Sequence, residues 1–245
     1  MSTPVITKPA KAVGESAGTL ASAAASLSSP VSARQYPFHI LLTTSPKGGV
    51  GKTGCSRNLA VAAAKSGKRV ALLDLDPQKS LSRWWQKRPD EGVEQIDLYS
   101  GSMTDLEETL AGVEGVDLLV VDTPTSVEEY PDEIKRLIMV ADFVLVPTGH
   151  TNDDLESVCP WMKMIRTYGR PAAFLLNKAN RRTKSFRHAQ TDLMSVGKLV
   201  PIEIPTLEDI HTAAKVGLSV IDVEDMGGAA EFTAAWKHIS LEMDL

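Results

Sequence analysis

A glycine-rich loop with two lysines and a threonine follows the first strongly apolar run of the chain. It reads Pro46-Lys47-Gly48-Gly49-Val50-Gly51-Lys52-Thr53. Glycines allow backbone N–H groups to turn inward around phosphate oxygens, and a helix beginning near Lys52 adds its positive N-terminal end. In such a loop the lysine contacts the β- and γ-phosphates, and the threonine hydroxyl contacts Mg²⁺. The loop therefore predicts a nucleotide site.

Three aspartates close apolar runs further along the chain. Asp74 and Asp76 lie in the segment LLDLDPQ, where the second apolar run ends, and Asp122 ends LLVVD. An aspartate at a strand end commonly reaches Mg²⁺ through water, because the ion keeps several waters of hydration. The alternative is that each aspartate caps the helix or turn that follows it. Because all three follow a phosphate loop, we expect them to serve a Mg²⁺–triphosphate.

The elements that must position these groups alternate along the chain. Apolar runs occupy residues 38–44, 69–75, 95–100, 116–122, 142–147, 172–177 and 199–204. Segments of helical length lie at 53–66, 78–88, 103–112, 131–140, 151–168, 184–195 and 207–216. Strands without polar alternation are typical of a parallel sheet that is buried on both faces. The pattern predicts a doubly wound α/β domain with a mainly parallel sheet, helices on both faces and its ligand at the carboxyl ends of the strands.

Composition limits the number of domains and the classes of partner. The chain has 245 residues, 43% of them apolar, with a formal net charge of −5. We expect one domain at 36–245 and no global attraction to nucleic acid or anionic membranes. Residues 1–35 are rich in Ala, Ser and Pro and predict a disordered tail, with a secretory or organellar leader as the alternative. Two cysteines do not make a disulfide framework, so we expect a reducing cytoplasm. We expect Cys55 to be a small buried residue of the helix that packs against the sheet.

Four segments resemble the ParA/MinD family of deviant Walker-A ATPases in order and spacing. They are KGGVGKT at 47–53, DLDPQ at 74–78, VVDTP at 120–124 and DFVLVPTGHTNDDL at 142–155. The resemblance runs from about residue 38 to about 225 and is to the small form of the family, which lacks an N-terminal helix-turn-helix domain. It implies ATP and Mg²⁺ as cofactors and a homodimer around two nucleotides. In that dimer Lys47 would reach the ATP of the second subunit.

The same resemblance implies roles for the charged residues of the site. Lys47 and Lys52 would stabilise the charge of the transferred phosphoryl group, and Asp76 would orient the attacking water. Asp74 and Asp122 would hold the Mg²⁺ shell through water, beside Thr53. We therefore expect slow ATP hydrolysis to ADP and phosphate, stimulated by a partner.

Three further positions concern the nucleoside end of the nucleotide. By the resemblance, Asn177 would face the adenine base and Pro205 would flank its other side. Gly54 departs from the family, which usually has a second Thr or Ser there. A hydroxyl that would contact the α-phosphate is therefore missing, although the backbone N–H of Gly54 remains for binding.

A basic segment without acidic residues spans 177–191, and it is the candidate DNA-binding surface. Its cationic side chains are Lys178, Arg181, Arg182, Lys184, Arg187 and His188. The spacing of Arg181, Lys184 and His188 predicts one cationic helical face that contacts DNA phosphates without reading sequence. Such binding is expected of ParA-like proteins. The alternative is a solvated loop that pairs with acidic residues elsewhere.

Two aromatic stretches raise the question of other partners. Residues 231–245 place Phe232, Trp236, Ile239 and Met243 along one helical stripe. The acidic residues of this segment would be repelled by an anionic bilayer, so we expect the stripe to pack on the domain's own core and no membrane partner. The adjacent tryptophans Trp84 and Trp85 fit either a partner surface or the core, with at least one of them buried.

Together these features favour an ATP-driven timer in the cytoplasm, associated with the nucleoid when ATP is bound. ATP would promote the dimer, the dimer would bind DNA, and a ParB-like or other adaptor protein would trigger hydrolysis and release. Alternatives are a nucleotide-switched regulatory scaffold without DNA binding, a MinD-like membrane-associated ATPase, and a metabolic kinase or synthetase. A plasmid, a chromosome, a receptor array or a protein microcompartment would leave the same motor residues as cargo.

Overall fold

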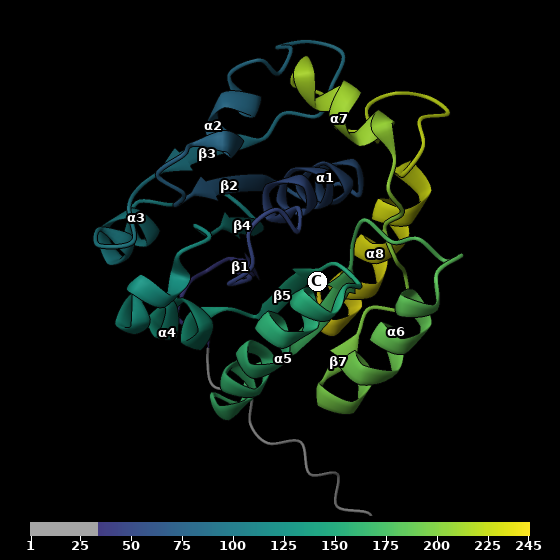
Figure 1. The fold of residues 1–245 in the computed structure, drawn as a ribbon. Helices are drawn as coiled ribbons and strands as arrows, with labels where there is room; N and C mark the ends of the chain where they lie inside the picture. Colours follow the sequence, from purple (N-terminus) through teal and green to yellow (C-terminus); the bar gives the residue numbers. More distant parts are fainter. Residues whose placement is uncertain (1–33) are drawn as a thin grey trace, which may run out of the picture. The chain divides into compact units, whose positions relative to one another are not determined.

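The structure is a computed structural model that describes residues 34–245. Seven strands in this range form one sheet in the order β3-β2-β4-β1-β5-β6-β7, and every neighbouring pair is parallel (Figure 1). The strands are β1 His39–Thr43, β2 Val70–Asp74, β3 Asp97–Ser100, β4 Leu118–Asp122, β5 Phe143–Thr148, β6 Ala172–Leu176 and β7 Lys198–Leu199. The expectation of a parallel, doubly wound sheet is confirmed.

Helices cover both faces of the sheet (Figure 1). They are α1 Lys52–Lys65, α2 Ser80–Trp85, α3 Leu106–Ala111, α4 Pro131–Val140, α5 Asn152–Thr167, α6 Lys184–Val196, α7 Glu208–Lys215 and α8 Ala229–Glu242, with a short 3-10 turn at Val127–Glu129. Strand side chains alternate between two cores: Leu41 belongs to the core that includes residues of α1, α2, α7 and α8, whereas Ile40 and Leu42 belong to the core that includes residues of α3, α4, α5 and α6. The five inner strands β1, β2, β4, β5 and β6 are thus buried on both faces, as their sequences predict, whereas the edge strands β3 and β7 are partly exposed.

The last predicted strand is wrong in extent. Residues 199–204 were expected to form a strand, but β7 comprises only Lys198 and Leu199. Val200 and Ile204 still donate backbone hydrogen bonds to β6, at 2.9 and 2.8 Å. Pro201 lies between them and has no N–H, so a regular ladder cannot continue through it.

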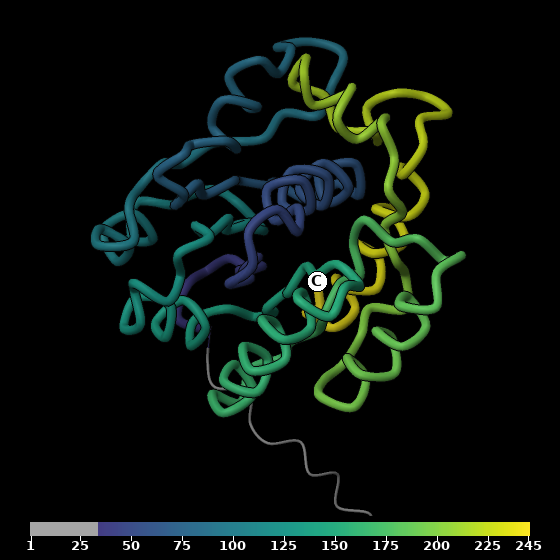
Figure 2. The backbone as a smooth tube through the Cα atoms, in the orientation of Figure 1, coloured from purple at the N-terminus to yellow at the C-terminus, as the bar shows by residue number. Residues whose placement is uncertain are grey.

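The C-terminal helix α8 packs beside α1, although the two are far apart in sequence (Figure 2). Phe232, Trp236 and Ile239 are buried in the core shared with α1, which confirms that this stripe faces the domain itself. Trp84 is also buried in that core and Trp85 packs partly against it. Within residues 34–245 no helix has the length and apolarity needed to cross a bilayer.

The predicted tail at 1–35 lies outside the described residues, apart from Arg34 and Gln35. Arg34 forms an ion pair with Asp142 at 3.0 Å, and the same carboxylate accepts a hydrogen bond from the backbone N–H of Ile40 at 2.8 Å. Arg34 is therefore held against the start of β1 and the start of β5.

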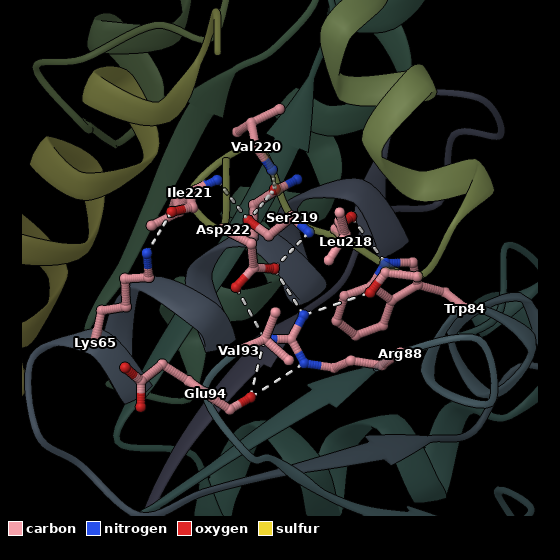
Figure 3. A network of polar contacts seen from close by, with 12 residues as sticks. Lys65, Trp84, Arg88, Val93, Glu94, Leu218, Ser219, Val220, Ile221 and Asp222 are labelled. Atoms are coloured by element: carbon pink, nitrogen blue, oxygen red, sulfur yellow. Dashed lines mark hydrogen bonds and ion pairs between the residues drawn. The ribbon is translucent and has the colours of Figure 1, made fainter. Parts of the chain in front are cut away.

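A buried polar network joins the segment between α7 and α8 to the segment after α2 (Figure 3). Arg88 forms an ion pair with Asp222 at 2.7 Å, and the two side chains are only 5% and 0% exposed. The guanidinium also lies 5.4 Å from the ring centre of Trp84. Asn58 of α1 accepts a hydrogen bond from the Ser219 hydroxyl at 2.7 Å. The network therefore ties α1 to both segments.

Candidate nucleotide-binding site

The glycine-rich loop joins β1 directly to α1, at the carboxyl end of the central strand. Gly49 and Gly51 have φ of +75° and +89°, a conformation that residues with a Cβ rarely adopt. A Cβ on Gly51 would also lie 2.2 Å from Nδ2 of Asn177. The helix begins at Lys52, as expected, so its first backbone N–H groups are available to a phosphate.

Asn177, at the end of β6, braces this loop. Its side-chain amide donates to the Val50 carbonyl at 2.7 Å, and its backbone N–H donates to the Thr148 carbonyl at 2.8 Å. The residue is buried, so the surrounding atoms hold its side chain beside Gly51. The adenine-facing role implied for Asn177 stays a prediction. The structure adds a support role for the loop that the sequence did not indicate.

The two lysines of the loop have different surroundings. Lys52 is buried, and its Nζ donates to the carbonyls of Ser45 and Lys47 at 3.1 and 3.4 Å. Burial lowers the pKa of Lys52, opposed in part by the charges of Asp122 and Asp76. Lys47 is half-buried, and within residues 34–245 its Nζ makes no hydrogen bond or ion pair. Its charge is thus available to a ligand or to a second copy of the chain.

Asp122 lies at the end of β4 beside the first turn of α1. Its carboxylate accepts hydrogen bonds from the hydroxyls of Thr53 at 2.7 Å and Ser56 at 3.0 Å. Burial raises the pKa of Asp122 to about 7, although both hydroxyls act in the opposite direction and nearby Asp74 adds to the rise. Ser56 was not identified from the sequence, and its position one turn after Lys52 is the signal that could have revealed it.

Asp74 and Asp76 lie at the end of the neighbouring strand, and Asp74 is directly opposite Asp122 in the sheet. The Asp74 carboxylate accepts from the backbone N–H and the hydroxyl of Ser82, at 2.8 and 2.6 Å, and from the Asp76 N–H at 3.1 Å. Asp76 is half-buried and accepts from the Gln78 N–H at 2.8 Å. Asp74 therefore caps α2, and its role in a metal shell stays a prediction.

The donor set fits Mg²⁺ bound together with a triphosphate. Among residues 34–245, no group of three or more His, Cys, Asp or Glu side chains could hold a metal alone. Mg²⁺ is normally held by one or two protein oxygens, with phosphate oxygens and water completing its shell. The Thr53 hydroxyl can supply such an oxygen, and the Asp122 carboxylate beside it can accept a hydrogen bond from a water of the shell.

A pocket of about 290 Å³ opens beside Gly51, at the start of α1. Gly54, Asn177, Thr206, Leu207 and Ile210 belong to its wall. Pro205 pairs with Ala179 in an isolated bridge, which places the following residues along the pocket. The stacking role expected of Pro205 stays a prediction. The wall also contains Arg57 and His211, which were not identified from the sequence.

The expected cationic helical face is corrected in one respect. Helix α6 begins at Lys184 with Thr183 as its N-cap, so Arg181 lies in the preceding loop and not on the helix. Arg181 forms an ion pair with Glu203, whose position outside the basic segment hid it from sequence reasoning. The other cationic side chains of the segment are exposed: Lys178, Arg182, Lys184, Arg187 and His188.

Cys55, in the first turns of α1, is fully buried against the sheet. Burial raises the pKa of its thiol to about 12, despite the nearby helix N-terminus. The expectation of a structural cysteine at this position is confirmed.

Comparisons with known proteins agree with this geometry. Residues 41–220 match the model of the CobQ/CobB/MinD/ParA nucleotide binding domain. The maintenance of carboxysome distribution protein A of Gloeobacter kilaueensis is 30% identical over 218 residues, covering 85% of this chain and 95% of that protein. Two solved structures have a similar fold. MinD of Pyrococcus horikoshii, complexed with Mg-ADP, has a TM-score of 0.66 and 18% identity, covering 82% and 96% of the two chains. The ATP complex of a McdA variant from Cyanothece has a TM-score of 0.65 and 15% identity, covering 85% of this chain and 97% of that chain.

The matched region contains the loop, the strand-end aspartates and the greater part of the sheet. The chain belongs to the CobQ/CobB/MinD/ParA nucleotide-binding family and is of the ParA/MinD ATPase type.

Proposed function

We propose that this chain is a positioning ATPase. With ATP and Mg²⁺ it forms a dimer that sandwiches two nucleotides, and the dimer binds DNA without sequence preference. An adaptor protein, ParB-like or of another kind, then stimulates hydrolysis and releases the dimer. The chain would work in the cytoplasm and associate with the nucleoid while ATP is bound.

The observation that carries the proposal is the position of Lys47. Lys47 is part of the phosphate loop and its ammonium has no partner among residues 34–245, whereas the Lys52 ammonium donates to the carbonyls of Ser45 and Lys47. A cation that faces the partner's γ-phosphate makes a charge-assisted contact with ATP that ADP lacks. The dimer is then favoured by ATP over ADP, because the nucleotide shifts the equilibrium by its differential contacts.

Hydrolysis would need few groups, since phosphoryl transfer depends chiefly on positioning and charge stabilisation. Thr53, together with Asp122 through water, would hold a Mg²⁺ ion, whose chemistry there is charge neutralisation of the phosphates. Lys52 would hold the terminal phosphates, and Asp76 at the end of β2 would orient the water.

Asp76→Ala tests this assignment. We expect the variant to bind ATP and to dimerise while its steady-state release of phosphate is lost. Full turnover in the variant would remove Asp76 from the water-positioning role.

DNA binding would use the exposed cations of the basic segment, principally Lys184 and Arg187 on α6 together with Arg182 in the loop before it. Removing one cation that binds a phosphate should lower the slope of the salt dependence by about one. We expect Lys184→Glu with Arg187→Glu to abolish binding of random-sequence duplex DNA by the ATP-bound form. The matched control is Lys135→Glu with Arg136→Glu on α4, where two exposed cations undergo the same change of charge.

A second candidate is a nucleotide-switched scaffold that controls a protein partner without DNA. The ion pair between Arg181 and Glu203 favours it, since it occupies one cation of the patch. The same DNA assay separates the two candidates: an unmodified ATP-bound protein that leaves DNA free would support the scaffold. The carboxysome relative indicates a large intracellular body as one class of cargo. Its identification requires a search for proteins encoded beside this chain.

A further inference from the structure

Arg57 lies in α1, one turn after Gly54, and the nucleotide assignments above give it no role. Its Nη2 donates to the Ile210 carbonyl at 3.0 Å. Its Nε is enclosed and has no partner among residues 34–245. No carboxylate forms an ion pair with it in that range, and burial lowers its pKa. A guanidinium has five N–H donors and no acceptor, so this one is incompletely paired.

The guanidinium faces the space that Gly54 leaves open. A Cβ built on Gly54 would have one neighbour within reach, Nη2 of Arg57 at 4.0 Å. Gly54 is the third residue of α1, and its φ is not in the left-handed region, so the backbone does not require glycine here. The missing side chain therefore leaves a gap between the start of the helix and the cation of Arg57.

This gap opens into the pocket of about 290 Å³ described above. Arg57, Lys178 and His211 contribute to its wall, and none of the residues that line it is acidic. An incompletely paired cation in a pocket without carboxylates is stabilised by an anionic ligand. The phosphate loop adjoins this pocket at Gly51, so the anion available there is the phosphate nearest the nucleoside.

We propose that Arg57 binds the α-phosphate of the nucleotide across the gap left by Gly54. The inference rests on the proposed nucleotide site and adds a binding residue to it. ATP, ADP and AMP share the α-phosphate, so Arg57 strengthens binding of all three and does not distinguish ATP from ADP. That distinction is left to Lys47, which does not line this pocket.

The test compares ligands that differ only in their phosphates. Dissociation constants for adenosine, AMP, ADP and a non-hydrolysable ATP analogue are measured by calorimetry or ligand-observed NMR on the full chain and on Arg57→Met. Methionine keeps an apolar stem and removes the charge. We expect AMP, ADP and the analogue each to bind about tenfold more weakly, the usual effect of losing a charged hydrogen bond. Adenosine affinity and the ATP:ADP ratio should stay within about twofold, and Arg136→Met, at an exposed site, should change nothing.

Two results would overturn the inference. If the affinities for AMP and ADP were unchanged, Arg57 would not bind the phosphate, and its role would be to hold α7 through the hydrogen bond to the Ile210 carbonyl. An equal loss for adenosine would place its effect on the base, the ribose or the pocket wall. Arg57→Gln serves the same comparison if the methionine variant does not fold. Failure of the unmodified chain to bind any of these nucleotides would refute the proposed function, a result distinct from both.

Discussion

Replacement of Asp122 by asparagine should stabilise the ligand-free protein in a pH-dependent manner. Burial raises the pKa of this carboxyl from 3.8 to about 7. Below pH 3.8 it is neutral in both states and carries no penalty. As the pH rises toward 7 the unfolded chain releases the proton while the folded chain retains it, so the wild-type protein loses stability. Because one pKa unit corresponds to about 1.36 kcal/mol, the rise of the pKa from 3.8 to about 7 gives an upper value of about 4 kcal/mol for this loss of stability.

The assay is urea unfolding at intervals from pH 4 to 8, without nucleotide or Mg²⁺. The free-energy difference between Asp122→Asn and wild type should grow from near zero at pH 4 to a few kcal/mol at pH 7 and then level off, since the amide is neutral throughout. The Thr53 and Ser56 hydroxyls donate to different oxygens of this carboxylate, so in the variant one can keep donating to the amide oxygen while the other rotates to accept from the amide NH₂. The same variant should lose Mg²⁺-dependent nucleotide binding.

Asp117 serves as the control, because its pKa is shifted in the opposite direction to that of Asp122. It lies on the surface, where hydrogen bonds from the Arg69 side chain and backbone lower its pKa to about 2. Its contribution is present above pH 3.8 and is lost only as the pH falls toward 2, so Asp117→Asn should give a flat difference over pH 4–8. If the stability difference between Asp122→Asn and wild type were also independent of pH, or decreased as the pH rises, the conclusion that burial raises the pKa of Asp122 would be refuted.

Three further perturbations follow from single contacts. Arg88→Met leaves the Asp222 carboxylate buried without its cation, so the free energy of unfolding should fall by about 3 kcal/mol and the melting temperature by roughly 10 °C. Adding Asp222→Asn should recover part of the loss, and an unchanged melting temperature in Arg88→Met would contradict the stabilising role of the ion pair. Gly51→Ala combines an unfavourable positive φ with a steric clash, so ADP affinity measured by calorimetry should fall at least about tenfold, and wild-type affinity would refute the loop geometry. In the native protein at pH 8, maleimide should label the partly exposed Cys159, whereas Cys55 should be labelled only after denaturation. Mass spectrometry of the peptides measures both, and labelling of Cys55 in the native protein would contradict its burial.

Much of the fold follows from local patterns in the sequence. Buried strands such as 116–122 and the helix after Lys52 were predictable because apolar runs, glycines and a lysine–threonine pair have direct local meaning. The strand order was not predictable, since it depends on crossover connections between distant segments. The short β7 shows how one proline, Pro201, overrides an otherwise apolar run.

Residues of the site were predictable from the sequence only where they belong to a recognisable motif. The sequence placed Lys47, Lys52 and Asp122 at the loop, but the bond from Asn177 to the loop depends on tertiary contact. The pairing of Arg181 with Glu203 is likewise invisible in a basic segment read alone.

The central claim is that Lys47 of one chain completes the nucleotide site of another, and the molar mass in solution tests it directly. One chain weighs 26.4 kDa. Light scattering coupled to size exclusion should give the mass of one chain without nucleotide and of two with Mg²⁺ and a non-hydrolysable ATP analogue. Lys47→Ala should bind the analogue and remain a single chain. A wild-type protein that stays monomeric with saturating analogue, or a Lys47→Ala variant that dimerises equally well, would contradict the account.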